Sequence, residues 1–328
     1  MLTAYALEKA GPVPVAVGTE PTLPDDAVWV DLLSPSREED AAAERALGIS
    51  LPTFEEAKEI EFSSRFYEEN GAILMTASLL SGVEEGSPAL SPITFALRGN
   101  RIATIRYHDP RSFRQFIVRT AKAEGSCSDA AGVLLGLLEA IIDRLADTVE
   151  KTGAEVDRLN HTIFMHGRER PRNERRSERQ LERVIEEIGV QGDFVAKARE
   201  SLASLQRLLQ YADSASKALE IGKHKGRLKL MARDARSLTD QLDFLSGKVI
   251  FLLDGALGLV TVQQNEVIRI LTVAAMFFFP PTLIGTIYGM NFQFMPELHW
   301  AIGYPLVIVA MVLSALLPYL YFKSRGWL

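Results

Sequence analysis

Two long segments without charged residues restrict the folds open to this 328-residue chain more than any other feature. Neither Ile270–Tyr288 nor Ala301–Phe322 contains Asp, Glu, Lys or Arg. A helix of about 20 residues spans the roughly 30 Å hydrocarbon core of a bilayer. Because only about a dozen residues separate the segments, they predict a transmembrane helical hairpin. A buried hairpin in a soluble protein is the alternative, but two such segments rarely coexist in a soluble fold.

Basic residues beside the two segments predict the orientation of the hairpin. Arg269 precedes the first segment, and Lys323 and Arg325 follow the second. The connecting loop, residues 291–300, has neither Lys nor Arg. The positive-inside rule therefore places both termini in the cytoplasm and the loop outside. The first residues of the chain lack the basic segment and apolar core of a signal peptide, which agrees with a cytoplasmic N-terminal region.

Residues 1–125 predict a mixed α/β domain. Short apolar runs bounded by turn residues are typical of strands, and Gly99-Asn100 between two of them indicates a two-residue hairpin. Ser34-Pro35 is expected to open a helix that Gly48 closes. The expected strands are Val13–Val17, Val28–Leu32, Ala72–Leu80, Ile93–Leu97 and Ile102–Tyr107.

The charge and cysteine content exclude several classes of function. The net charge of −6 argues against a nucleic-acid partner. Acidic residues are concentrated between residues 25 and 70, where we expect a solvated face or, alternatively, a surface that concentrates cations. The single cysteine, Cys127, cannot form an internal disulfide and is expected to be a reduced thiol. No nucleophile–base pair, cofactor loop or P-loop stands out, so the sequence indicates neither an enzyme nor ATP use.

Helical periodicity begins near residue 128 and predicts three long helices that pack as a stalk. Arg and Glu alternate between residues 168 and 187, which favours an exposed, self-paired surface. The apolar residues at three- and four-residue spacing are Leu134, Leu138, Ile141, Leu145, Val156, Leu159 and Ile163; Leu181, Ile185, Ile188, Val195, Leu202, Leu205 and Leu209; and Leu238, Leu242, Leu245, Val249 and Leu252.

The string Tyr288-Gly289-Met290-Asn291-Phe292 stands at the outer end of the first apolar segment. It follows PPTLI and precedes MPEL, and in this position it resembles the signature of the CorA magnesium transporters. The resemblance covers the whole chain, from the acidic α/β domain to the basic tail. It implies an α+β membrane protein, assembled as a homopentamer in a bacterial-type inner (plasma) membrane with both termini cytoplasmic. The expected parts are an α/β domain at 1–125, stalk helices at 126–265, a pore-lining transmembrane helix at 266–290, an external loop at 291–300, a second transmembrane helix at 301–322 and a cytoplasmic tail at 323–328.

The residues Gly289, Met290 and Asn291 are the candidate selectivity filter. Mg²⁺ gives up its water reluctantly, so a pore that conducts it quickly should touch the hydrated ion with neutral polar groups. Asn291 supplies an amide oxygen, and Gly289 permits a tight turn. No carboxylate in either apolar segment would trap the ion. Two helices cannot enclose a pore, so several copies must surround one axis.

One face of the first apolar segment, continued toward the stalk, is the candidate pore lining. Its hydroxyl and amide groups would be polar stations, and Ile268, Leu271 and Phe279 would be apolar constrictions that gate by dewetting. Close packing of small residues between membrane helices is the alternative. The resemblance points to the same positions, although Ile268 and Phe279 stand where relatives often carry Met. The candidate residues are Asn265, Ile268, Leu271, Thr272, Ala275, Phe279, Thr282 and Thr286.

Asp254 is the candidate regulatory residue. It precedes Asn265 by eleven residues, or three helical turns, and so lies on the same helix face. The resemblance implies that an aspartate in this Leu-Leu-Asp context contributes to Mg²⁺ binding between subunits, with Glu84 or Glu85 of the partner subunit as candidate ligands. A solvated surface acid is the alternative. Lys323 and Arg325 are expected to form a basic ring at the cytoplasmic end of the pore.

The resemblance implies a channel that carries Mg²⁺, and in addition Co²⁺ and Ni²⁺, down the membrane potential. Internal Mg²⁺, as a regulatory ligand, would close it by binding the closed state better than the open one. One alternative is a zinc transporter of the ZntB type, including a proton-coupled form. Another is a membrane-anchored sensor or scaffold that does not conduct.

Overall fold

The structure is a computed structural model, and it describes residues 1–8, 11–15, 23–24, 26–59, 61–83, 86–122, 127–166, 174–215, 221–291, 295–296, 300 and 302–325. The chain divides into two compact units, Met1–Leu253 and Asp254–Leu328. Helix α7 (Lys225–Tyr288) contributes residues to both units, and α8 (Gly303–Ser324) belongs to the second.

A seven-stranded sheet forms the centre of the first unit, in the order β2-β1-β3-β7-β6-β5-β4. Strands β3 and β7 are parallel, and every other neighbouring pair is antiparallel. The strands are β1 (Leu2–Glu8), β2 (Gly11–Val15), β3 (Trp29–Leu33), β4 (Phe66–Glu69), β5 (Ala72–Ser81), β6 (Ala89–Arg98) and β7 (Arg101–Arg106).

Each of the five predicted runs overlaps a strand, and the Gly99-Asn100 hairpin is confirmed because Arg98 pairs with Arg101. The sequence analysis did not predict β1 and β4. Strand β4 precedes Asn70-Gly71, where both residues have positive φ, 49° and 75°. That dipeptide is a strong hairpin signal and could have revealed β4.

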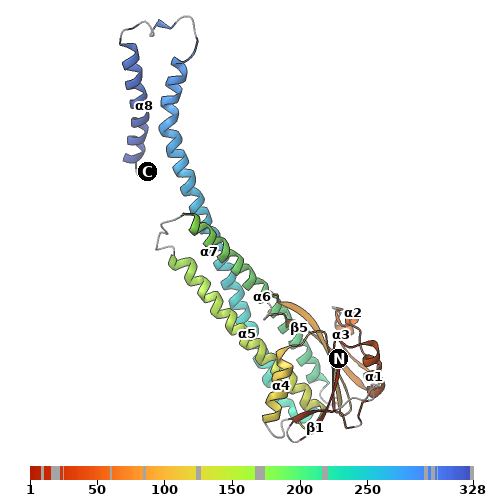
Figure 1. Ribbon diagram of the computed structural model, residues 1–328. Coiled ribbons are helices and arrows are strands. Elements are labelled where there is room, and N and C mark those ends of the chain that lie inside the picture. Colours follow the sequence, from red (N-terminus) through yellow and green to blue (C-terminus); the bar gives the residue numbers. More distant parts are fainter. Residues whose placement is uncertain are drawn as a thin grey trace. The chain divides into compact units, whose positions relative to one another are not determined.

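Helices cover both faces of the sheet, because alternate residues of each strand point to opposite sides. Val30 and Leu32 pack with Ala43 and Leu47 of α1 (Arg37–Leu47) on one face. On the other face, Trp29 and the alternate residues of β5 and β6 pack against α4 (Arg111–Lys122), α5 (Ala130–His166) and α6 (Glu174–Ser214), as Figure 1 shows. The short elements are α2 (Phe54–Ala57), α3 (Phe62–Arg65) and the 3-10 helix η1 (Ile221–His224).

Helix α1 begins two residues later than expected. Its N-cap is Ser36, whose side chain accepts a hydrogen bond from the backbone N–H of Glu39, while Glu39 caps Ser36 in return. Gly48 ends the helix in the left-handed conformation, as predicted. Glu39 also pairs with the N-terminal ammonium group at 2.9 Å. This acid therefore makes structural contacts and is not simply a solvated surface charge.

The long helices confirm the apolar periodicity of the sequence. Every residue in the three predicted sets is buried except Leu181 and Ile185, which are half-buried. Helix α7 extends much further than the third predicted set, because it runs without interruption through Pro280 and Pro281 to Tyr288. Cys127 is buried, and its thiol lies 3.5 Å from the carbonyl oxygen of Gly132.

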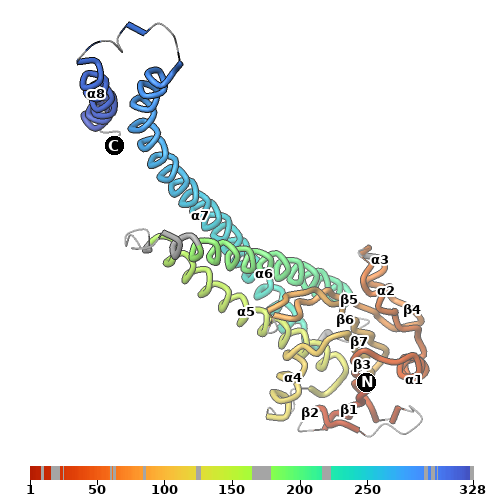
Figure 2. The backbone as a smooth tube through the Cα atoms, turned by 45° about the horizontal axis from the view of Figure 1, so that its top comes forward, coloured from red at the N-terminus to blue at the C-terminus, as the bar shows by residue number. Residues whose placement is uncertain are grey.

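Helix α6 completes an open edge of the sheet. Strand β4 pairs only with residues Ala72–Met75 of β5. Further along β5, the backbone N–H groups of Ser78 and Leu80 donate to the hydroxyls of Ser204 and Ser201, at 2.9 and 3.0 Å. Figure 2 shows α6 running alongside β5. The two buried serines therefore take the place that a neighbouring strand would fill.

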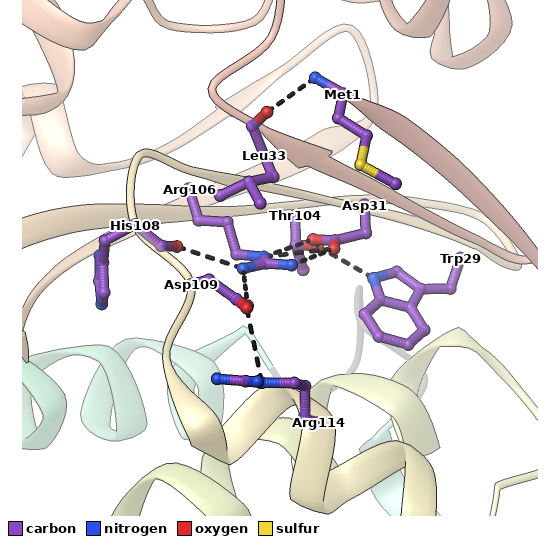
Figure 3. A network of polar contacts seen from close by, with 9 residues as sticks. All are labelled: Met1, Trp29, Asp31, Leu33, Thr104, Arg106, His108, Asp109 and Arg114. Atoms are coloured by element: carbon purple, nitrogen blue, oxygen red, sulfur yellow. Dashed lines mark hydrogen bonds and ion pairs between the residues drawn. The ribbon is translucent and has the colours of Figure 1, made fainter.

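A buried ion pair joins the parallel strands β3 and β7 (Figure 3). The guanidinium of Arg106 donates to both carboxylate oxygens of Asp31, with a closest distance of 2.7 Å. Thr104 donates to the same carboxylate at 2.7 Å and accepts from the indole N–H of Trp29 at 2.9 Å. Asp31 was expected on a solvated acidic face, and that expectation is wrong for this residue, which is 4% exposed. The pair is stable in the interior because its polar atoms are hydrogen-bonded.

The same arginine holds the segment that leads from β7 to α4. Arg106 donates to the backbone carbonyl of His108 at 3.2 Å and to the carboxylate of Asp109 at 2.6 Å. Burial, together with the charge of Arg106, lowers the pKa of His108 to about 4. Its imidazole is therefore neutral at pH 7.

We expect this half-buried histidine to make the first unit sensitive to acid. The unfolded chain takes up the His108 proton near pH 6.5, whereas the folded chain does so only near pH 4. The stabilisation is therefore complete above pH 6.5 and is lost as the pH falls toward 4. Between pH 7 and 5 the loss should be on the order of 1–2 kcal/mol, allowing for partial solvent exposure.

Denaturant unfolding of the full chain at both pH values, followed by circular dichroism, measures this effect. His108→Gln should lose less stability on acidification than the wild type. His161→Gln, at an exposed position on α5, is the matched control and should behave as the wild type does. Equal acid sensitivity in the wild type and His108→Gln would contradict the assignment.

Candidate functional site

The candidate pore lining lies on one exposed face of α7 in the second unit. At 100° per residue, Asp254 and the eight lining candidates fall within an arc of roughly 120°. All eight lining candidates are exposed, including Leu271 at 70% and Phe279 at 69%. Apolar side chains in a contiguous exposed face require lipid or further protein to cover them.

Among the described residues, two helices are long and apolar enough to cross a membrane. The most apolar window of α7 has a mean hydropathy of 1.9 and is 0% buried, and that of α8 has a mean hydropathy of 2.1 and is 6% buried. A core helix of a soluble protein would be mostly buried. In both views α8 lies beside the last turns of α7 (Figures 1 and 2).

A small residue lets α8 approach α7 closely. A Cβ atom added at Gly285 would lie 3.0 Å from the terminal methyl carbon of Met311 on α8. Small residues at such contacts are typical of helix packing in membranes, where close van der Waals contact replaces the hydrophobic effect. Close packing of small residues between helices, which was the alternative to a pore lining, therefore describes Gly285. This residue is not one of the lining candidates.

The threonines of α7 present hydrogen-bond acceptors to their surroundings. Thr272, Thr282 and Thr286 each donate the hydroxyl proton to the carbonyl four residues earlier, at 2.8, 2.7 and 2.8 Å. With the proton engaged inside the helix, the lone pairs of each hydroxyl oxygen remain to accept from another molecule. The water shell of a hydrated cation points its hydrogens outward, so it requires acceptors of this kind.

Two carbonyls of α7 also lack their usual helical donors. The residues four positions after Met276 and Phe277 are Pro280 and Pro281, which have no backbone N–H. In a membrane such carbonyls need water or another polar group. They lie in the same stretch of helix as Phe279 and Thr282.

Helix α7 ends in a tight turn at the candidate filter. The N–H of Gly289 donates to the carbonyls of Gly285 and Thr286, at 2.9 and 3.2 Å, and Met290 donates to Ile287 at 3.3 Å. A Cβ atom at position 289 would lie 3.2 Å from the carbonyl oxygen of Gly285. Since Gly289 has no left-handed φ, close approach of the backbone explains the glycine better than conformational freedom does. Met290 and Asn291 are exposed beyond the turn, and Phe292 lies outside the described residues.

Asp254 is exposed on the same arc as Asn265. Its candidate partners, Glu84 and Glu85, lie outside the described residues. Within the part of the chain that the structure describes, no three or more His, Cys, Asp or Glu are grouped to hold a metal ion.

The basic tail residues lie at the end of α8 beside aromatic rings. The ammonium of Lys323 is 5.9 Å from the ring centre of Tyr319, and the guanidinium of Arg325 is 5.7 Å from that of Tyr321. Aromatic and basic side chains together are typical of the end of a membrane helix.

Comparison with known proteins covers nearly the whole chain. Residues 24–324 match the family described as CorA-like Mg²⁺ transporter protein. The magnesium transport protein CorA of Salmonella typhimurium (strain LT2) is 34% identical over 328 residues, which cover 100% of both chains.

Among solved structures, the complete CorA magnesium transporter from Methanocaldococcus jannaschii superposes with a TM-score of 0.73. It is 18% identical, and the match covers 100% of this chain and 99% of that one. The cytoplasmic domain of ZntB from Vibrio parahaemolyticus has a TM-score of 0.56 and 12% identity, covering 80% of this chain and 98% of that domain. At these identities the two structures establish a shared fold.

Proposed function

This chain belongs to the family of CorA-like Mg²⁺ transporter proteins, and on that premise we propose that it is a membrane channel that conducts Mg²⁺ into the cell. The observation that carries the proposal is the exposed face of α7, which combines hydroxyl acceptors with apolar side chains and ends in the turn Gly289-Met290-Asn291. These groups are better suited to contact a hydrated divalent cation than a dehydrated one.

The proposed path begins at Asn291. Repeated around an axis, its amide oxygens accept hydrogen bonds from the water shell of Mg²⁺, and Gly289 keeps the turn narrow. The hydroxyl oxygens of Thr286, Thr282 and Thr272 then offer successive acceptors, and Asn265 offers another. Phe279, Leu271 and Ile268 narrow the path with apolar groups, so it can close by loss of water without tight binding of the ion. Ala275 leaves room between these apolar side chains.

We propose that five copies form this pore, with α7 of each copy facing the axis and α8 facing lipid. One α7 presents only one face, and its apolar window is 0% buried in a single chain. A ring of copies encloses the polar arc and leaves the apolar remainder to the bilayer. The mass of the detergent-solubilised complex, compared with 36.3 kDa for one chain, tests the number of copies.

The hairpin should place both termini in the cytoplasm of a bacterial-type inner membrane. In a Cys127→Ala background, Met295→Cys in the loop should react with an impermeant thiol reagent added to intact cells. Asp213→Cys, at an exposed position on α6, is the matched control and should react only after the cells are opened. Reaction of Asp213→Cys alone in intact cells would reverse the topology.

The membrane potential is a sufficient driving force. A divalent cation gains about 4.6 kcal/mol on crossing a 100 mV inside-negative potential, twice the value for one charge. Conduction therefore requires no nucleotide, but the pore must be closed when the internal Mg²⁺ concentration is sufficient. We propose that internal Mg²⁺, bound near Asp254 between subunits, stabilises the closed state, and that Lys323 and Arg325 form a basic ring at the cytoplasmic side.

Ion uptake by liposomes that contain the purified protein tests the function. Under an inside-negative potential we expect Mg²⁺ uptake, with Co²⁺ and Ni²⁺ as further permeant ions. Protein-free liposomes are the control. Uptake of Zn²⁺ without Mg²⁺, with or without a proton gradient, would instead support a ZntB-like transporter. If a correctly assembled complex takes up none of the four ions, the result would support a membrane-anchored sensor or scaffold that does not conduct.

A further inference from the structure

Helix α7 has a second face in the second unit that the proposed ion path does not use. Between Val273 and Tyr288, the half-buried residues gather on one side of the helix, and all other residues of this stretch are exposed. They are Val273, Met276, Pro280, Pro281, Ile284, Gly285 and Tyr288. At 100° per residue, the centre of this side lies about 170° around the helix from the centre of the eight lining candidates. The two faces of α7 therefore point in nearly opposite directions.

Helix α8 has a matching face. Ala315 is 7% exposed, and half-buried residues recur around it at three- and four-residue spacing. They are Val307, Ala310, Met311, Ser314, Pro318 and Phe322. Met311 of this face contacts the half-buried face of α7 at Gly285, and α8 lies beside the last turns of α7 in Figures 1 and 2. Helix α8 therefore packs on the side of α7 that faces away from the lining candidates.

Gly285 connects this contact with the candidate filter. A Cβ atom at position 285 would lie 3.0 Å from the terminal methyl carbon of Met311. The carbonyl oxygen of Gly285 accepts a hydrogen bond from the N–H of Gly289 at 2.9 Å, and a Cβ atom at position 289 would lie 3.2 Å from that oxygen. The same residue therefore allows the approach of α8 and holds the turn that leads to Asn291.

We propose that the contact between Gly285 and Met311 positions the filter turn, so that both are positioning residues for Asn291. The inference rests on the proposed function, because it gives α8 a part in the same pore. A larger side chain at position 285 must displace either Met311 or the backbone of α7, since closely packed helices leave little free space. A shift of that backbone moves the Gly285 carbonyl, and with it the turn. In a ring of copies the same shift occurs in every subunit, so the whole outer mouth changes.

The effect should grow with the size of the side chain at position 285. The atom nearest to an added Cβ is the end of the flexible Met311 side chain, which can rotate away. Gly285→Ala should therefore keep Mg²⁺ uptake close to that of the wild type. Valine adds two methyl groups whose rotation is restricted. Gly285→Val should lower uptake per assembled complex about tenfold and raise the Mg²⁺ concentration that gives half-maximal uptake.

Truncation of Met311 should restore the missing space. The double variant Gly285→Val with Met311→Ala should recover most of the lost uptake and the wild-type half-maximal concentration. Leu313→Ala is the matched control, because Leu313 is 49% exposed and lies on the opposite side of α8 from Met311. Combined with Gly285→Val, it should restore neither quantity. Met311→Phe fills the same space from α8, should also lower uptake, and covers the case in which Gly285→Val fails to assemble.

The reactivity of a thiol in the filter turn tests the positioning without transport. In a Cys127→Ala background, which removes the single native cysteine, Met290→Cys reports on the turn through its rate of reaction with a water-soluble thiol reagent in detergent. Gly285→Val should change this rate several-fold, and Met311→Ala should reverse the change. A wild type that takes up no Mg²⁺ would refute the proposed function, whereas these rates would still decide the positioning.

A contact that only holds the two helices together predicts different results. It would lower the amount of assembled protein and leave both the uptake per complex and the thiol reactivity unchanged. That outcome in Gly285→Val and Met311→Phe, or equal rescue by Met311→Ala and Leu313→Ala, would overturn the inference.

Discussion

Asn291→Ala should abolish Mg²⁺ uptake while the complex remains folded and assembled. Asn291 is exposed beyond the last turn of α7, so its side chain contributes little packing to the fold. In an assembly of five copies, however, one substitution removes a whole ring of amides from the outer mouth. At about 1 kcal/mol for each of the five hydrogen bonds to the hydrated ion, the loss corresponds to a rate lower by roughly 5,000-fold.

Uptake of Mg²⁺ into liposomes, normalised to assembled protein, measures this effect. Tyr304→Phe on α8 is a suitable control, because Tyr304 is exposed and lies outside the proposed path. Its uptake should match the wild type. Wild-type uptake by a well-assembled Asn291→Ala protein would exclude a filter role for this amide.

Asp254→Lys should remove the protection that internal Mg²⁺ gives against proteolysis. In the proposed closed state, Mg²⁺ bridges carboxylates of adjacent subunits, and ligand binding stabilises the state that binds it. A lysine at this position repels the cation and supplies a positive charge in its place. We therefore expect several-fold slower digestion of the wild type in millimolar Mg²⁺ and no such difference in the variant.

Limited proteolysis of the full-length complex, with and without Mg²⁺, is the measurement, and current recordings accompany it. Asp234→Lys is the matched control. Asp234 is also exposed on α7, but it lies about 160° around the helix from Asp254. Full Mg²⁺ protection of Asp254→Lys, with currents still closed by the same internal Mg²⁺ concentration, would make Asp254 a solvated surface acid.

The helices of the second unit could be predicted well because their signals are local. A run without charges predicts a helix that is long and apolar enough to cross a membrane, and the period of 3.6 residues determines which side chains share a face of α7. The buried apolar sets of α5, α6 and α7 followed from the same period. The lining residues and Asp254 therefore stand on the face that the sequence indicated, although their roles remain proposals.

The N-terminal sheet was harder to predict because strands depend on distant partners. Strand β1 reads as a weakly apolar segment, and only its pairing with β2 and β3 makes it a strand. The ion pair between Asp31 and Arg106 joins residues 75 positions apart, so composition placed Asp31 on an acidic surface.

The proposed regulatory site depends on more than one copy of the chain. A ligand set divided between subunits would leave no motif within one chain. The helical spacing from Asn265 places Asp254 on the same face of α7, and its proposed role rests on the family resemblance, whereas a choice between Glu84 and Glu85 would depend on a surface that only the assembly creates.

The serine contacts that cover the edge of β5 also bear on how the chain is made. Ser201 and Ser204 follow the strand residues they cover by 121 and 126 positions. A ribosome that adds about 5–20 residues per second needs roughly 6–25 s to synthesise that interval. Throughout this period β5 has been translated, but the helix that satisfies its outer N–H groups has not. A nascent chain whose synthesis pauses before α6 thus exposes the unpaired edge of β5 to other nascent chains on the same mRNA. It needs either a chaperone or uninterrupted translation to avoid aggregation.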